Sequence, residues 1–399
     1  MARPFKIVLI TLLLAFLSMA SSSGAPVGEA NEPSPTGDLS AMDSVEIGLV
    51  TCAPHDEVYS LYGHTALRWH DLRTGQDIVF NYGIFSFKKP FFVWRFVFGL
   101  TDYELGVAPT RPFLRYYEEW GSEVTEQVLN LTAMEKRRLT AALNMNAQPA
   151  NRVYRYNFFF DNCATRPRDM VERNIEGKVG YAPRTGYDMT FRDMVHQQTR
   201  RHPWAAFGND MLLGLRVDMK TMQREQQFLP DNLRYDFDHA SIVTDDGTHR
   251  PLVSERRQLV PPGVQMEEEE AFPLRPMTCA LLLLALSLAV FVFEQLRHTV
   301  VRWFDVALML LTGLAGCVLF VMVFSEHPAT SANLQLLLLN PLPLFFVWKV
   351  ARGRKTRWFA IQAVLLVLFC VGGLWQSYAE GMYVVAACVL TRCWRHLRQ

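Results

Sequence analysis

The apolar residues of this chain are concentrated in its last third. Five apolar stretches follow Pro276 and are separated by short polar segments: 277–293, 304–324, 331–348, 358–375 and 381–390. A helix that crosses a bilayer needs about 20 mainly apolar residues. The first four stretches approach or reach that length, and the fifth is shorter. We therefore predict an α-helical membrane domain of five spans over residues 277–399.

The charges between these stretches predict how the spans are oriented. Lys and Arg residues occur in segments 297–302, 349–357 and 392–398, whereas segments 325–330 and 377–380 contain neither. Cytoplasmic loops carry an excess of Lys and Arg. The bias therefore places the C-terminus in the cytoplasm and everything before the first span outside it.

The N-terminus indicates export of the same region. Residues 1–25 contain Arg3 and Lys6, then the apolar run 7–17, then small residues, which is the layout of a secretory signal peptide. Residues 26–43 are rich in Pro, Gly, Ser and Ala and predict a disordered lead-in. The signal peptide and the charge bias are unrelated signals, and both predict that the region before the first span is exported.

The exported domain is predicted to span residues 44–262. Alternating apolar and polar positions predict a strand at 45–51, a hairpin that pairs 65–71 with 77–82, and a strand at 122–131. Thr132 to Glu135 forms a capping box before an amphipathic helix. This order of elements predicts a compact α+β domain, and the acidic segment 263–276 links it to the membrane region.

The candidate nucleophile is Cys163. The aromatic stretch 154–160 predicts a strand that ends at Asp161 and Asn162 and delivers Cys163 to the start of a helix over 164–174. A thiol at a helix N-terminus meets unpaired N–H groups and the positive end of the macrodipole, which favour the thiolate. We expect Asp161, Asn162 or nearby backbone N–H groups to orient the nucleophile or to hold an oxyanion.

A cysteine nucleophile also needs a base, and the best candidate is His64. It follows a glycine and opens the strand-like run of the predicted hairpin. Asn81, on the partner strand, is the candidate for orienting the imidazole. Arg68 shares a strand face with His64 and can meet either a substrate phosphate or a structural carboxylate. Tyr62 is a further candidate for substrate contact.

Other interpretations of these residues remain open. Cys52 and Cys163 are the only cysteines of the exported domain, and exported domains tolerate disulfides. The strings 208–214 and 228–233 are distinctive but have no evident chemistry. No His, Cys, Asp or Glu set has metal-ligand spacing, and no basic patch is interleaved with aromatics. We predict no metal, no cofactor and no nucleic acid.

Two features indicate contact with lipid. The aromatic segment 85–98, which has two lysines near its start, is typical either of an interfacial segment or of an ordinary aromatic core. Within the third apolar stretch, Pro341 and Pro343 are predicted to interrupt the helix. Free backbone carbonyls at membrane depth are tolerated only against protein or water, so this break can shape a lipid-facing groove.

Three motifs together carry a resemblance to a known family. Residues 63–68 read Gly-His-Thr-Ala-Leu-Arg, residues 81–83 read Asn-Tyr-Gly, and residues 161–165 read Asp-Asn-Cys-Ala-Thr. With the five apolar stretches that follow, they resemble the Lnb-type lipoprotein N-acyltransferase family of the Bacteroidota. The order of His before Cys is similar to the circularly permuted branch of the NlpC-like papain superfamily. The turn at 52–55 departs from the more glycine-rich pattern expected, which leaves the roles of Cys52 and His55 open.

The resemblance implies a fold, a reaction and a location. The exported domain would be a permuted papain-like (NlpC-like) catalytic domain in the periplasm, above a multi-pass region in the bacterial inner membrane. A membrane phospholipid would donate an acyl chain through a Cys163 thioester. The acceptor would be the α-amine of the diacylglyceryl-cysteine of an apolipoprotein. The rival functions are a cysteine peptidase or amidase acting on cell-wall peptides, and a non-enzymatic membrane sensor.

Overall fold

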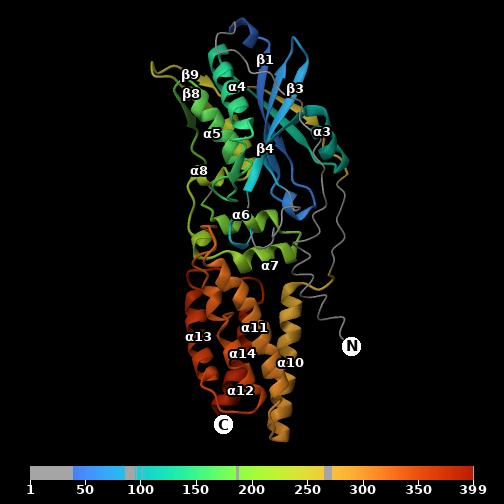
Figure 1. Ribbon diagram of the computed structural model, residues 1–399, viewed down its shortest axis with the longest axis vertical. Helices are drawn as coiled ribbons and strands as arrows, with labels where there is room; N and C mark the ends of the chain where they lie inside the picture. The colour runs from blue at the N-terminus through green and yellow to red at the C-terminus, as the bar shows by residue number, and fades with distance from the viewer. Residues whose placement is uncertain are drawn as a thin grey trace.

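A computed structural model describes residues 39–85, 95, 97–100, 102–185, 188–264 and 272–398. The expected signal peptide, most of the aromatic segment 85–98 and part of the acidic linker lie outside the described residues. In Figure 1 a sheet-rich upper part stands above a bundle of helices. Helices α6 (Phe191–Gln198) and α7 (Pro203–Leu212) lie between the two parts.

The upper part is built on a seven-stranded sheet in which every neighbouring pair is antiparallel, in the order β10-β5-β1-β2-β3-β4-β6. Its strands are β1 (Val45–Cys52), β2 (His64–Asp71), β3 (Gln76–Ile84), β4 (Asp102–Pro109), β5 (Val124–Leu129), β6 (Val153–Arg155) and β10 (Val253–Val260). The predicted hairpin is confirmed, because β2 pairs with β3 across the turn after Asp71. The predicted strands at 45–51 and 122–131 correspond to β1 and β5.

Helices cover both faces of this sheet. Helices α4 (Ala133–Ala147) and α5 (Thr165–Asn174) pack on one face, and α3 (Thr110–Glu119) packs on the other. Successive side chains of a strand point to opposite faces. Accordingly Leu49 of β1 belongs to the core under α4 and α5, whereas Val50 belongs to the core under α3. The predicted capping box at the start of α4 is confirmed.

A second, three-stranded sheet lies beside the α5 face and contains the predicted late hairpin. It is formed by β7 (Lys178–Tyr181), β8 (Ala240–Val243) and β9 (His249–Pro251). Among the described residues, the upper part also contains η1 (Leu39–Met42), η2 (Val58–Ser60), η3 (Leu215–Asp218), α8 (Gln223–Gln226) and α9 (Pro230–Asp238). The N-terminal domain is thus an α+β domain, as expected.

The lower part contains α10 (Pro276–Arg297), α11 (Arg302–Met322), η4 (Leu334–Leu337), η5 (Leu342–Phe345), α12 (Val347–Ala351), α13 (Trp358–Gly372) and α14 (Met382–Leu397). Within the described part of the chain, α10 and α11 are the helices long and apolar enough to cross a bilayer by length and composition. Helices α13 and α14 have 15 and 16 residues. Helix length alone therefore accounts for two of the five spans predicted.

The third apolar stretch is a broken segment rather than one helix. Short 3₁₀ turns, η4 and η5, flank Asn340 and Pro341 before α12 begins. Proline lacks the N–H that would continue a helical ladder, so the predicted break is confirmed. The backbone of Asn340 lies directly against Gly316 of α11, where a Cβ would collide with it. Glycine therefore allows the broken segment to pack closely on α11.

Candidate active site

The loop before α5 is closed by a pair of backbone hydrogen bonds. The N–H of Asn157 donates to the carbonyl of Asp161 at 3.0 Å, and the N–H of Asp161 donates back at 2.9 Å. Cys163 follows this bridge and immediately precedes the first turn of α5. The predicted strand over 154–160 is wrong, because β6 ends at Arg155 and the residues after it form this bridge-closed turn. The predicted helix start beside Cys163 is confirmed, and the thiol is free and partly buried.

The side chain of Asn162 holds this junction together. Its Oδ1 accepts hydrogen bonds from the backbone N–H groups of Ala164 and Thr165, both at 2.9 Å. Its Nδ2 donates to the carbonyls of Phe158, at 2.9 Å, and Phe228, at 2.8 Å. Both functional atoms of this buried amide are engaged. Of the two roles expected for Asn162, its contacts support orientation of the nucleophile.

His64 and Asn81 lie together on neighbouring strands. His64 is the first residue of β2, and its Nε2 lies 2.6 Å from the Oδ1 of Asn81 on β3. An amide oxygen can only accept, so Nε2 is the protonated nitrogen and Nδ1 carries the lone pair. The structure brings these two predicted residues into contact.

Gly83 lies beside both Cys163 and His64. A Cβ at this glycine would lie 3.6 Å from Cβ of Cys163 and 3.9 Å from Cε1 of His64. Gly83 has a φ of +97°, and β3 bulges between Asn81 and Ile84. Sequence reasoning did not give Gly83 a role, although a glycine within a strand often marks close approach by another group.

Burial controls the protonation of both groups. It raises the pKa of the Cys163 thiol to about 11, although the backbone N–H groups of Thr65 and Cys163 act in the opposite direction. It also lowers the pKa of His64, and the contact with Asn81 offsets only part of this change. Both effects favour the uncharged forms. Burial therefore opposes the thiolate that the helix dipole favours and makes a neutral thiol beside a neutral imidazole the favoured resting pair.

Three tyrosines, Tyr103, Tyr154 and Tyr156, lie near the Cys163 thiol. Tyr103 of β4 stacks on Tyr156 with ring centroids 4.1 Å apart, and Tyr103 pairs in register with Tyr154 of β6. Burial, and repulsion between each phenolate and a Cys163 thiolate, raise the pKa of all three tyrosines. They remain neutral phenols. The aromatic residues of segment 154–160 are evident in the sequence. The position of Tyr103 beside them is not, because Tyr103 is 60 residues before Cys163.

Three other predicted site residues have partners within the protein. Arg68 donates to Asp77 at 2.8 and 2.7 Å and to Glu126 at 2.9 Å, which supports the structural alternative. Asp161 forms a two-point ion pair with Arg166 of α5, at 2.6 and 2.8 Å. The hydroxyl of Tyr62 accepts from Asn209 of α7 at 2.8 Å. These contacts place Arg68 and Asp161 in structural ion pairs and direct Tyr62 toward α7.

The alternative disulfide is not formed. Cys52 is a free, buried thiol in the core under α3, where it packs with Tyr117. His55 is also buried, and its ring stacks on Trp120 at 4.6 Å between centroids. Among the described residues, no three His, Cys, Asp or Glu side chains are grouped as metal ligands.

Comparisons with known proteins match both parts of the chain. Residues 37–197 match the family described as the Lnb N-terminal periplasmic domain, and residues 267–399 match the Lnb transmembrane domain. No curated protein and no solved structure matches the chain.

Proposed function

The chain belongs to the Lnb family, as a membrane protein with a periplasmic N-terminal part, and from that premise we propose that it is a lipoprotein N-acyltransferase. The observation that carries the proposal is that Cys163 and the hydrogen-bonded His64–Asn81 pair lie beside the same glycine, Gly83. A nucleophile beside a base that a third group orients is the arrangement required for covalent acyl transfer.

In the first half-reaction, Cys163 takes the acyl chain from a phospholipid. Nδ1 of His64 accepts the thiol proton as the sulfur attacks the ester carbonyl. The carbon–oxygen bond then breaks, His64 returns the proton to the departing lysophospholipid oxygen, and a Cys163 thioester remains. Because the resting pair is neutral, proton removal and sulfur attack occur together. By accepting from Nε2, Asn81 leaves Nδ1 as the nitrogen that takes the thiol proton.

In the second half-reaction, the lipoprotein amine takes the acyl chain from the thioester. The α-amine of the diacylglyceryl-cysteine attacks the thioester carbonyl, and the carbon–sulfur bond breaks as the amide forms. His64 accepts a proton from the amine and passes it to the departing sulfur, which restores the neutral pair. A thioester reacts with amines more readily than an oxygen ester does, so the covalent step makes the second transfer easier.

The position of the site relative to the helices supports a donor in the membrane. Tyr62, two residues before His64, bonds to α7, and α7 packs its Phe207 and Met211 into the core of the helical domain. The end of the sheet that carries the site therefore faces the helical domain rather than the distal tip (Figure 1). We place this domain in the inner membrane with its C-terminus in the cytoplasm. Donor and acceptor then share the outer leaflet.

A Cys–His–Asn group can also cleave a cell-wall peptide, so the test must separate the two reactions. Lipoprotein N-terminal peptides are analysed by mass spectrometry from cells with wild-type protein, Cys163→Ala, or the exposed membrane-domain control Cys370→Ala. We expect triacylated N-termini in the wild type and the control, and free amines in Cys163→Ala. The same lipid pattern in all three strains would contradict the proposal and leave wall hydrolysis as the leading function.

A further inference from the structure

Segment 208–214 showed no evident chemistry in the sequence. In the structure it connects the chain just before β2, the strand that carries His64, to the membrane domain. On the upper side, Nδ2 of Asn209 donates to the hydroxyl of Tyr62 at 2.8 Å. Tyr62 packs edge-to-face on Phe158, with centroids 4.7 Å apart. Phe158 in turn accepts a hydrogen bond from Asn162, which orients Cys163. Asn209 of α7 is therefore linked through Tyr62 and Phe158 to the loop that carries Cys163, and Tyr62 lies two residues before His64.

Buried amide side chains of the membrane domain donate hydrogen bonds to the backbone carbonyls of residues that follow Asn209. Nε2 of Gln335 donates to the carbonyl of Asp210 at 2.7 Å, and Nδ2 of Asn333 donates to the carbonyl of Met211 at 2.8 Å. Nε2 of Gln376 donates to the carbonyl of Leu213 at 3.2 Å. The three amide side chains are at most 6% exposed. Buried amides lose free energy when a partner is removed, so this junction has one preferred arrangement.

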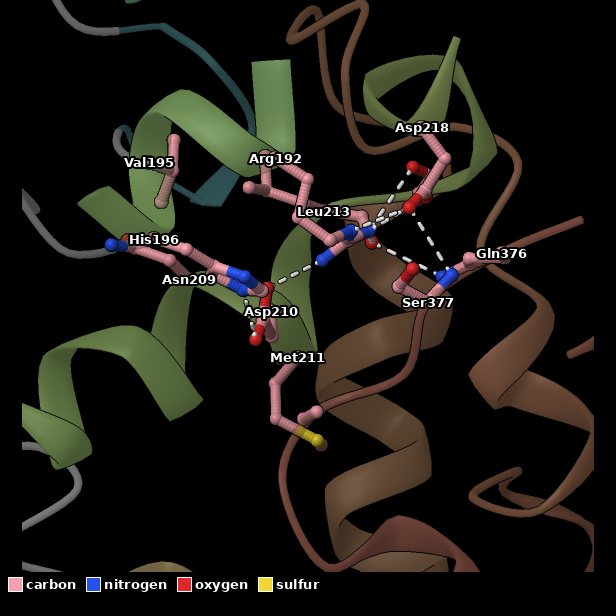
Figure 2. Close-up of polar contacts among 12 residues, drawn as sticks. Arg192, Val195, His196, Asn209, Asp210, Met211, Leu213, Asp218, Gln376 and Ser377 are labelled. Carbon is pink, nitrogen blue, oxygen red and sulfur yellow. Dashed lines mark hydrogen bonds and ion pairs between the residues drawn. The ribbon is translucent and has the colours of Figure 1, made fainter. Parts of the chain in front are cut away.

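An ion cluster stabilises the same junction. Figure 2 shows the guanidinium of Arg192 between Asp210 and Asp218, which it contacts at 2.6 and 2.9 Å. Nε2 of His196 contacts both carboxylate oxygens of Asp210, at 2.9 and 2.8 Å, and the backbone N–H of Ser377 donates to Asp218 at 3.2 Å. A buried guanidinium is tolerated only with well-placed partners, so Arg192 fixes α6, α7 and η3 against the loop before α14.

The main chain contributes to the junction as well. The N–H of Gly214 donates to the carbonyl of Ala329 at 2.8 Å, and the N–H of Leu215 donates to the carbonyl of Ala332 at 2.7 Å. A Cβ at Gly214 would lie 2.7 Å from that same oxygen of Ala332. Gly214 therefore allows the two backbones to approach, and the junction cannot slide without breaking hydrogen bonds.

We infer that segment 209–214 holds the Cys163–His64 pair at a fixed position over the bilayer, with Asn209, Gln335 and Gln376 as positioning residues. The inference rests on the proposed function in one respect, that the reacting ester lies in the membrane. A soluble reagent can approach the thiol from many directions, whereas a lipid ester arrives at one depth. Misplacement by about 1 Å can slow an oriented reaction by roughly 100-fold.

The test compares two electrophiles on the full-length protein in phospholipid vesicles. One is iodoacetamide in water, and the other is a phospholipid that carries an iodoacetyl group at the position of its ester. The alkylation rate of the Cys163 peptide is measured for each by mass spectrometry, with Gln335→Leu compared against Gln362→Leu. Gln362 is an equally buried glutamine of α13 whose Nε2 has no hydrogen-bond partner among the described residues.

In Gln335→Leu we expect the ratio of lipid-borne to soluble labelling to fall by roughly 10-fold or more. In Gln362→Leu the ratio should stay within about twofold of the wild type. Gln376→Leu gives the same readout if Gln335→Leu does not fold, as judged by its thermal unfolding. An unchanged ratio in the folded junction variants, or an equal loss with both reagents, would overturn the inference. Alkylation needs no acyl transfer, so failure of the proposed function is recognised separately, by wild-type cells whose lipoproteins keep free amines.

Discussion

Nε2 of His64 donates to Oδ1 of Asn81 at 2.6 Å, between the first residue of β2 and the inner part of β3. The contact selects the imidazole tautomer whose bare nitrogen is Nδ1. It also fixes the ring plane, since a hydrogen bond of this length tolerates little rotation. In the proposed reaction, Asn81 therefore acts on the base and not on the substrate.

Replacing Asn81 by Ala should lower kcat by roughly 100-fold, because the ring can then rotate and change tautomer. Asn81→Asp keeps an oxygen acceptor and should recover part of the rate. The measurement is the rate of Cys163 acylation by a soluble short-chain ester, with thermal unfolding recorded for both variants. A wild-type rate in Asn81→Ala would show that Asn81 does not orient the base.

The alkylation rate of Cys163 should keep rising with pH through the neutral range. The thiolate is the reactive form, and burial raises the pKa of this thiol to about 11. The thiolate fraction therefore grows by about tenfold for each pH unit below that value. Iodoacetamide labelling of the Cys163 peptide between pH 6 and pH 10, a range of about four units, measures this directly. A plateau near neutral pH would mean that a thiolate–imidazolium pair is already formed at rest.

Replacing Gly83 by Ala should remove activity by placing a methyl group next to both Cys163 and His64. The added carbon would lie 3.6 Å from Cβ of Cys163, and the φ of +97° adds a backbone strain of about 1–3 kcal/mol. Gly75→Ala is the matched control, because Gly75 has a φ of +74° and no heavy atom within 4 Å of such a Cβ.

Both glycine variants should lose stability by denaturant unfolding, and only Gly83→Ala should lose the ability to form an acyl-Cys163. Equal activity in the two variants would contradict the placement of the thiol and the base around Gly83.

Asn162→Ala should destabilise the junction that carries the nucleophile by about 1–3 kcal/mol, because it leaves buried N–H and carbonyl groups without partners. Asn174 serves as the control at the other end of α5, where its side chain donates a single bond to the carbonyl of Met170 at 2.7 Å. Unfolding in urea gives the two free energies. Cys163 alkylation should become faster in Asn162→Ala than in Asn174→Ala, since the loosened loop exposes the thiol. The reverse order would argue against an orienting role.

The parts of the fold that depend on local patterns could be predicted from the sequence. The alternation of apolar and polar residues predicted β1 and the β2–β3 hairpin, and the capping box of Thr132 and Glu135 predicted the start of α4. Pro341 and Pro343 gave the break in the third apolar stretch. Each of these features is encoded within a few consecutive residues, so the sequence alone was sufficient.

The missed features depend on contacts between distant segments. Gly83 lies beside Cys163 at the bulge of β3 between Asn81 and Ile84, and the two residues are far apart in the sequence. Asn209 reaches Tyr62 across 147 positions, and no local pattern indicates that contact. The effect of burial on Cys163 was missed for a related reason. The helix dipole can be inferred from the sequence, but the burial that raises the pKa of the Cys163 thiol is a property of the folded site.

In the proposed reaction, Cys163 carries an acyl chain from a phospholipid to a lipoprotein amine. The most direct measurement uses purified protein in vesicles whose phospholipid has an isotope-labelled acyl chain, together with a diacylglyceryl-cysteine peptide. Mass spectrometry follows the label on Cys163 and on the peptide amine. We predict a labelled, hydroxylamine-sensitive Cys163 without the acceptor, and transfer of that label to the amine when the peptide is added. An amine that becomes labelled in Cys163→Ala, or a wild type that labels neither group, would show that the acyl chain does not travel through Cys163.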